Sequence, residues 1–382
     1  MDEKVFLDLA GRFMSLPTAS FHERFVCQAV EAFVAERPAI KCTRDPYGNL
    51  LLLYDGRPSH SQRRPYLVAT AHLDHPGIAY SAKISKCEFA FEKLGGFDLD
   101  LALKSTVRIF QLDLPPDQKP TKGKITDFRP QQGRRPSALI VKVKSFSAKG
   151  IGPGSFAMWD LPPFKQKDRL LLSRACDDLA GVTVGLSYMS ALARLQQPVR
   201  AGLLLTRAEE IGFGGMLAVV RGKHIDPRAL YINIECSSIK AGAVLGAGPV
   251  IRVGDRGRVF DPYISGGMVA LAEDMEATYP GFRFQRKLMD GGICEATVLA
   301  NAGLQTGAVA LPLKNYHNSG KKRLKPEVVH LDDALGLVDL LVHMATRPGG
   351  VAGAWRKASR KLDKAMNQRH RRSAGRLART GL

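Results

Sequence analysis

The sequence lacks any run of about 18 apolar residues, so no part of it is predicted to span a membrane. It also lacks the basic start and apolar core of a secretory signal, because Met1-Asp2-Glu3-Lys4 opens on acids. From these two absences we expect a cytoplasmic location. Aromatic residues make up only 7% of the chain, but hydrophobic residues reach 45%, which is ordinary for a globular protein.

Cysteine pairs are absent as well. No Cys-x-x-Cys motif occurs, and six cysteines in 382 residues are too few for a disulfide framework. We therefore expect reduced and mostly buried thiols at Cys27, Cys42, Cys87, Cys176, Cys236 and Cys294.

Acidic residues are scarce relative to basic ones, 36 against 56, which gives a formal net charge of +20. Residues 356–382 carry ten of the lysines and arginines but only one acid, Asp363. Such a block is typical of a solvated, partly helical tail, or of a segment that contacts nucleic acid, anionic lipid or a partner subunit. No aromatic residue follows Trp355, which disfavours stacking on single-stranded bases.

The length of 382 residues exceeds what one compact core usually organises, so we expect two structural units. Residues 79–168 are rich in Lys, Pro and Gly and contain short β-like stretches such as Thr106–Leu112 and Ala138–Val143. They predict a small inserted β domain. The expected division is a catalytic domain over 1–78 and 169–348, the insert at 79–168, and a basic tail at 349–382.

Outside the insert, helical and apolar strand-like segments alternate. Apolar strands such as Pro65–Ala71, Ala201–Thr206, Leu230–Ile234 and Gly307–Pro312 indicate burial on both faces. The predicted fold is therefore α/β, with a central mixed sheet flanked by helices. Near the start, the Ser20-Phe21-His22-Glu23 segment fits a capping box that opens a helix reaching about Glu36.

Five acidic or imidazole clusters lie at the ends of predicted strands, where open α/β sheets form their ligand crevices. They are His72-Leu73-Asp74, Asp177-Asp178, Glu209-Glu210, Glu235 and His317. Imidazole and carboxylate ligands suit zinc, cobalt or manganese. A pair of ions needs one bridging group, which a carboxylate can supply, so these residue types fit two histidines and three acids on two ions, with one acid free for proton transfer.

The ordered set of these residues resembles the M42 family of metallo-aminopeptidases, which is related to the M18, M20 and M28 peptidases. The long gap from His72 to Asp177, filled by the predicted insert, is similar to the layout of M42 rather than M20. The resemblance covers roughly residues 5–346. It implies a zinc-exopeptidase type of fold, in which the inserted domain serves assembly and access.

The resemblance implies a ligand set for two divalent metal ions per chain, zinc or cobalt. His72 would bind one ion and His317 the other, and Asp177 would bridge them. Glu235 would complete the shell of the first ion and Glu210 that of the second.

Two further residues have roles that the resemblance implies. Glu209 would act as general base on the attacking water and pass the proton to the departing amine. Asp74 would lie behind His72 and accept its second ring N–H. The family also implies a cis peptide bond at Asp177-Asp178.

The implied activity is removal of the N-terminal residue from short peptides, by a homo-oligomer of two to twelve copies. Two departures from the family leave the substrate open: Gly291-Gly292-Ile293-Cys294-Glu295 replaces a Gly-Gly-Thr-Asp-Ala segment, and Lys314-Asn315 replaces Arg-Tyr. Glu235 also stands where the family often has Asp. The alternatives are a related metallohydrolase, either an N-acyl amino acid deacylase or a carboxypeptidase, and a non-catalytic homologue that uses the basic tail.

Overall fold

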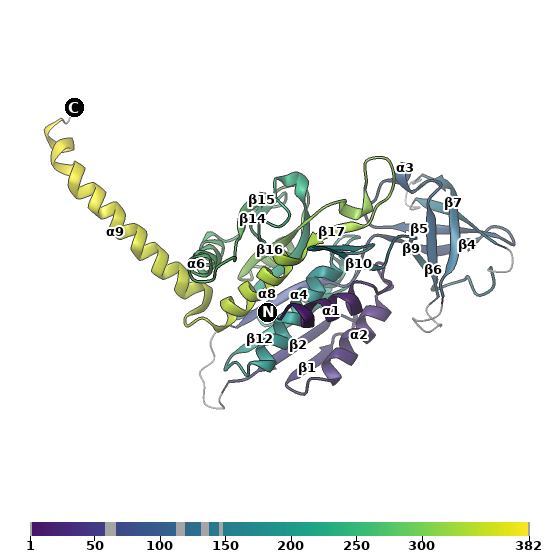
Figure 1. Cartoon of the computed structure of the whole chain (residues 1–382), viewed down its shortest axis with the longest axis horizontal. Helices are drawn as coiled ribbons and strands as arrows, with labels where there is room; N and C mark the ends of the chain where they lie inside the picture. Colours follow the sequence, from purple (N-terminus) through teal and green to yellow (C-terminus); the bar gives the residue numbers. More distant parts are fainter. Residues whose placement is uncertain (1, 58–65, 112–118, 131–136, 145–147, 381–382) are drawn as a thin grey trace.

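The computed structural model describes residues 2–57, 66–111, 119–130, 137–144 and 148–380. Pro65 and Leu112, the outer ends of two expected strands, lie outside these ranges. The described chain forms a central α/β body with a small β-barrel at one end and a long C-terminal helix projecting from the other (Figure 1). No helix in these ranges combines the length and the apolarity needed to cross a bilayer.

An eight-stranded mixed sheet forms the centre of the body. In spatial order its strands are β1 (Ile40–Arg44), β2 (Leu50–Asp55), β12 (Arg200–Thr206), β3 (Leu67–His72), β13 (Leu230–Ser238), β16 (Thr306–Leu313), β14 (Val250–Asp255) and β15 (Gln285–Met289). The four strands from β12 to β16 are parallel to one another, whereas β2 and β14 run antiparallel to them. The carboxyl ends of four neighbouring strands therefore meet at one edge.

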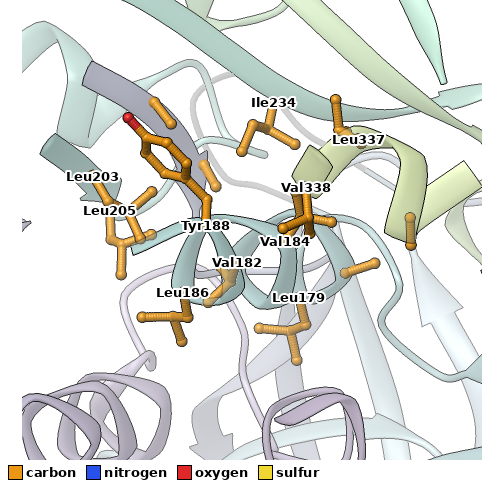
Figure 2. Close-up of a cluster of buried hydrophobic side chains, with 14 of the residues drawn as sticks. Leu179, Val182, Val184, Leu186, Tyr188, Leu203, Leu205, Ile234, Leu337 and Val338 are labelled. Atoms are coloured by element: carbon orange, nitrogen blue, oxygen red, sulfur yellow. The ribbon is translucent and has the colours of Figure 1, made fainter. Parts of the chain in front are cut away.

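Helices cover both faces of this sheet. On one face lie α4 (Leu179–Arg194) and α8 (Leu331–Thr346), and on the other lie α5 (Gly214–Arg221) and α7 (Glu295–Asn301). Leu203 and Leu205 of β12 pack with Tyr188 of α4, while Leu204 between them packs on the side of α5. Figure 2 shows the first of these clusters, with Ile234 of β13 above α4. Burial on both faces explains the apolar runs of the central strands.

The remaining helices flank the sheet or extend from it. They are α1 (Glu3–Phe13), α2 (Arg24–Ala35), the short α3 (Leu99–Ala102), α6 (Pro262–Thr278), α9 (Gly350–Arg379), and the 3₁₀ turns η2 (Ile239–Ala241) and η3 (Tyr316–Asn318). The side chain of Asp2 caps α1 by accepting hydrogen bonds from the backbone N–H groups of Lys4 and Val5.

A closed six-stranded barrel interrupts the body between β3 and the strands that precede α4. Its strands are β4 (Gly77–Lys83), β5 (Glu88–Leu94), β6 (Thr106–Phe110), β7 (Thr121–Arg129), β8 (Ala138–Val143) and β9 (Phe156–Trp159). A separate three-stranded sheet contains β10 (Phe164–Lys167), β11 (Leu170–Ser173) and β17 (Glu327–His330). The barrel strands run from Gly77 to Trp159, so they begin two residues before the predicted 79–168 insert, and β10 at the end of that range pairs with β11 of the body.

The expected capping box at Ser20 is wrong. Helix α2 begins at Arg24, and its N-cap residue Glu23 makes no side-chain capping bond. The hydroxyl of Ser20 donates instead to Oδ2 of Asp74 at 2.6 Å, and the carboxylate of Glu23 accepts from the backbone N–H of Ala208 and from Arg207. Both side chains are buried and bind tertiary partners, and Glu23 also accepts locally from the backbone N–H of Phe21 at 2.9 Å.

Candidate active site

All five predicted clusters come together at the carboxyl edge of the central sheet. His72 ends β3, Glu209 and Glu210 follow β12, and Glu235 lies within β13. His317 lies in η3, just after β16, and Asp177 lies between β11 and α4. The parallel strands β12, β3, β13 and β16 share one carboxyl edge, so side chains from distant parts of the chain meet there.

The two histidines face opposite oxygens of one carboxylate. His72 Nε2 lies 3.3 Å from Asp177 Oδ1, and His317 Nε2 lies 3.6 Å from Asp177 Oδ2. Glu235 Oε1 is 3.6 Å from His72 Nε2, and Glu210 Oε2 is 3.3 Å from His317 Nε2. The arrangement is two His–carboxylate groups that share Asp177.

Each group has the dimensions of a metal site. The ligand atoms of His72, Asp177 and Glu235 lie within 4.8 Å of one another, and so do those of Asp177, Glu210 and His317. Asp177 Oδ1, Glu210 Oε1 and His317 Nε2 are buried without a hydrogen-bond partner among the described residues. Buried polar atoms are normally satisfied, so these atoms fit divalent cations with mixed imidazole and carboxylate ligands.

A buried excess of carboxyl groups surrounds this point. Besides Glu210, seven are buried: Asp74, Asp177, Asp178, Glu209, Glu235, Glu295 and Glu327. Uncompensated buried charge is costly. Cations, or protons on some of the carboxyls, are therefore required for this cluster to stay folded.

The acids and histidines shift one another's protonation. Burial opposes charge on His72, but Glu209 and the other carboxylates raise its pKa well above the usual range. Burial likewise raises the pKa of Glu209 well above its usual range, against the attraction of His72. For Asp177, burial alone would raise the pKa, but the nearby imidazoles of His317 and His72 lower it.

Asp74 holds the loop that carries the two glutamates. Its Oδ1 accepts the backbone N–H of Glu209 at 2.9 Å, and its Oδ2 accepts that of Glu210 at 3.2 Å. The Nδ1 atom of His72 lies 3.2 Å from the backbone carbonyl oxygen of Asp74 and 3.5 Å from Oδ1 of the carboxylate. The nearer acceptor for the ring N–H is thus the carbonyl, and the carboxylate mainly fixes the glutamate loop.

Three more buried side chains line the site, and the sequence interpretation did not assign them to it. Glu327, at the start of β17, accepts the backbone N–H of Asp177 at 3.0 Å. His75 faces the carbonyl oxygen of Asp177 through Nδ1 and lies 3.1 Å from Asn318 Oδ1 through Nε2, and burial lowers its pKa to about 4. A sequence signal existed only for His75, which lies one residue beyond the first cluster.

The peptide bond between Asp177 and Asp178 is cis, as the resemblance implies. Asp178 is fully buried, and burial raises the pKa of its carboxyl well above the usual range. With Asp177 and Cys236 it forms a further group of close ligand atoms. The thiol of Cys236 donates to the backbone carbonyl of Cys176 at 3.4 Å.

The two segments that depart from the family are only partly buried: Cys294 and Glu295 are buried, whereas Ile293 and Lys314 are exposed. Glu295 is fully buried and accepts a hydrogen bond from the Thr206 hydroxyl at 2.8 Å, and the backbone N–H of Cys294 donates to Asp255. Asn315 has a left-handed backbone, φ 59°, and donates to the Pro326 carbonyl at 2.7 Å. Cys294, Glu295 and Asn315 are thus held by hydrogen bonds within the fold.

Comparison with known proteins finds a family match for most of the chain. The sequence profile of the M42 glutamyl aminopeptidases matches residues 48–340. A search of curated protein sequences finds no significant match.

Solved structures share the fold. An aminopeptidase of the archaeon Desulfurococcus kamchatkensis is 22% identical, with a TM-score of 0.74 over 90% of this chain and 95% of that one. The TET aminopeptidase of Thaumarchaeota archaeon SCGC AB-539-E09 is 18% identical, with a TM-score of 0.74 over 92% and 99%. The TET1 peptidase of Pyrococcus horikoshii, which can assemble into a tetrahedron or a large octahedral shell, is 20% identical, with a TM-score of 0.72 over 90% and 99%.

Proposed function

This chain belongs to the M42 glutamyl aminopeptidase family and is a peptide hydrolase, and from that premise we propose that it removes N-terminal residues from short peptides with two divalent cations. The observation that carries the proposal is that Asp177 presents its two oxygens to two different histidines. His72 and Glu235 would hold one cation, and Glu210 and His317 the other. Zinc or cobalt suits these ligands best.

Bound cations would supply a water of lowered pKa and polarise the scissile carbonyl. Glu209 is the carboxyl left over once the ligands are assigned, and its backbone N–H is fixed by Asp74. It would accept the proton of the attacking water and deliver it to the leaving amine. The surplus of carboxylates around the site would also attract the substrate's free α-ammonium group.

The experiment is substitution of Glu209→Gln, which keeps the shape of the side chain and removes its basicity. We expect kcat/KM on a panel of free-amine peptides to fall by about 10²–10⁴-fold, the usual contribution of a general base. Metal analysis should still find about two ions per chain, and circular dichroism should be unchanged. The matched control is Glu88→Gln, at the start of β5 in the barrel, which should keep full activity.

The same panel should include N-acetylated versions of each peptide. A metal-loaded protein that cleaves only the blocked peptides would replace this proposal with the deacylase alternative. A protein that cleaves neither form, with both cations present, would remove peptide hydrolysis at this site altogether.

A further inference from the structure

Helix α9 lies outside the region matched by the family and takes no part in the site described above. Only its root packs on the body. Val351 is buried and its backbone passes close to Gly267 of α6, and the Trp355 ring meets Tyr263 edge to face, with centroids 5.4 Å apart. Beyond Trp355 the helix leaves the body as a free rod (Figure 1). Residues 356–379, hereafter distal α9, span about 36 Å at 1.5 Å per residue.

Distal α9 is strongly cationic along its whole length. It carries ten basic side chains, seven of them arginine, against the single acid Asp363. Among the residues that the structure describes, none of these ten side chains forms an ion pair with an acid. Nothing in the described fold therefore neutralises this charge, and arginine in particular binds phosphate oxygens through two parallel N–H groups.

The charges are not spread evenly around the helix. The uncharged residues Trp355, Leu362, Met366, Ser373 and Leu377 follow one another at spacings of seven and four residues, which places them along one side. Trp355 shows that this side faces α6. Eight of the ten cations occupy the rest of the circumference, whereas Arg369 and Arg376, seven and fourteen residues after Leu362, border the uncharged side. The basic surface therefore covers most of distal α9.

This distribution of charge selects among possible partners. A second copy would bring another block of positive charge, in a chain whose total is +20. A bilayer would have to bind the uncharged side of distal α9, whose exposed large apolar side chains are Leu362, Met366 and Leu377, a narrow stripe beside ten cations. A single strand needs aromatic platforms, and none follows Trp355. A duplex presents rows of phosphates and a groove that admits an α-helix.

We propose that distal α9 binds the phosphate backbone of double-stranded nucleic acid, without preference for base sequence. The arginine and lysine side chains form a broad arc around distal α9, and this arc complements the phosphates on both sides of a groove. Binding of this kind depends steeply on salt, because each neutralised phosphate releases a counterion.

The test uses full-length protein and fluorescence anisotropy of labelled 24-base-pair DNA and RNA duplexes, with the corresponding single strands for comparison. The variant replaces Arg360, Lys364, Arg371 and Arg372 together with Gln, which retains helix propensity. We expect it to bind duplex at least tenfold more weakly than the wild type at about 0.1 M salt. The slope of log K against log salt should flatten by about one for each lost phosphate contact.

The matched control alters the uncharged side, Leu362→Gln with Met366→Gln, and should bind duplex within twofold of the wild type. Neither set lies in the active site, so peptidase activity and circular dichroism should not change. Equal duplex binding by wild type and the four-residue variant would overturn the proposal. So would binding to phosphatidylglycerol vesicles that is tighter than binding to duplex and is lost in the control variant, because that result would assign the helix to a membrane surface.

Discussion

At the scale of single residues, Asp74 shows how a carboxylate outside the metal ligand set can govern the site. It accepts hydrogen bonds from the backbone N–H groups of Glu209 and Glu210 and from the Ser20 hydroxyl, and it is fully buried. The proposed general base, Glu209, and one proposed metal ligand, Glu210, are thus tied to a single anion. Groups that orient ligands in this way commonly contribute 10–100-fold to metal affinity or activity.

Asp74→Asn should therefore lower activity by about 10–100-fold, because one of its two acceptor oxygens becomes an N–H₂ group that faces a donor. Peptidase kinetics and metal titration measure the effect. Ser20→Ala removes only one of the three donors and should cost much less. Equal losses in the two variants would show that Asp74 does not act through the glutamate loop.

Glu295 gives a prediction for pH. Burial raises its pKa to about 8, whereas an unfolded glutamate titrates near its ordinary value. Between those two pH values the folded state keeps a proton that the unfolded state has released. The contribution of Glu295 to the free energy of unfolding therefore falls as the pH rises towards 8, and it stays constant above that pH.

We expect wild-type protein in EDTA to lose about 1 kcal/mol per pH unit relative to Glu295→Gln between pH 5 and 8. Urea unfolding of both proteins at several pH values measures this difference. Parallel stability curves would mean that Glu295 is already ionised in the folded protein.

At the scale of elements, the central strands were predictable because burial on both faces leaves an apolar run in the sequence. The strand β14 was not expected, because Arg252, Gly254 and Asp255 break its apolar run. The short strands β10, β11 and β17 have too few residues to show a period. The convergence of the proposed ligand residues was predictable from residue type and order. Glu327 gave no local sign, because its partner is a backbone N–H 150 positions away.

The packing of α9 on α6 depends on a glycine pair. A Cβ atom on Gly267 would lie 2.3 Å from the Val351 carbonyl oxygen, and one on Gly266 would lie 2.4 Å from the Trp355 ring. Backbone cannot move aside as a flexible side chain can, so the two helices approach closely only with glycine here.

Gly267→Ala should therefore destabilise the root of α9 by about 1–3 kcal/mol, the usual cost of overpacking. Thermal unfolding and the fluorescence of the two tryptophans, one of which is Trp355, report the change. Gly375→Ala, within distal α9 and with no atom close to an added Cβ, should be neutral or slightly stabilising. If both variants behave alike, close approach is not what holds α9 in place.

At the scale of the whole molecule, metal and stability should be linked. A ligand that binds only the folded state stabilises it, by about 2.7 kcal/mol at a concentration one hundred times its Kd. Here the linkage should be strong, because without cations the buried carboxylates repel one another.

Chelation with EDTA should lower the melting temperature and abolish peptidase activity together. Adding zinc or cobalt should restore both, and magnesium should restore less, because imidazole ligands disfavour it. Differential scanning fluorimetry with metal analysis measures this. Full removal of metal without any shift in melting temperature would contradict a two-cation site among these residues.

The barrel and distal α9 extend from opposite ends of the body (Figure 1). In any assembly joined through the barrels, the distal α9 helices would project from the outer surface of the assembly. Several copies of distal α9 could then bind one long polyanion at the same time. This multivalency would give the assembly a high overall affinity even where each helix binds weakly.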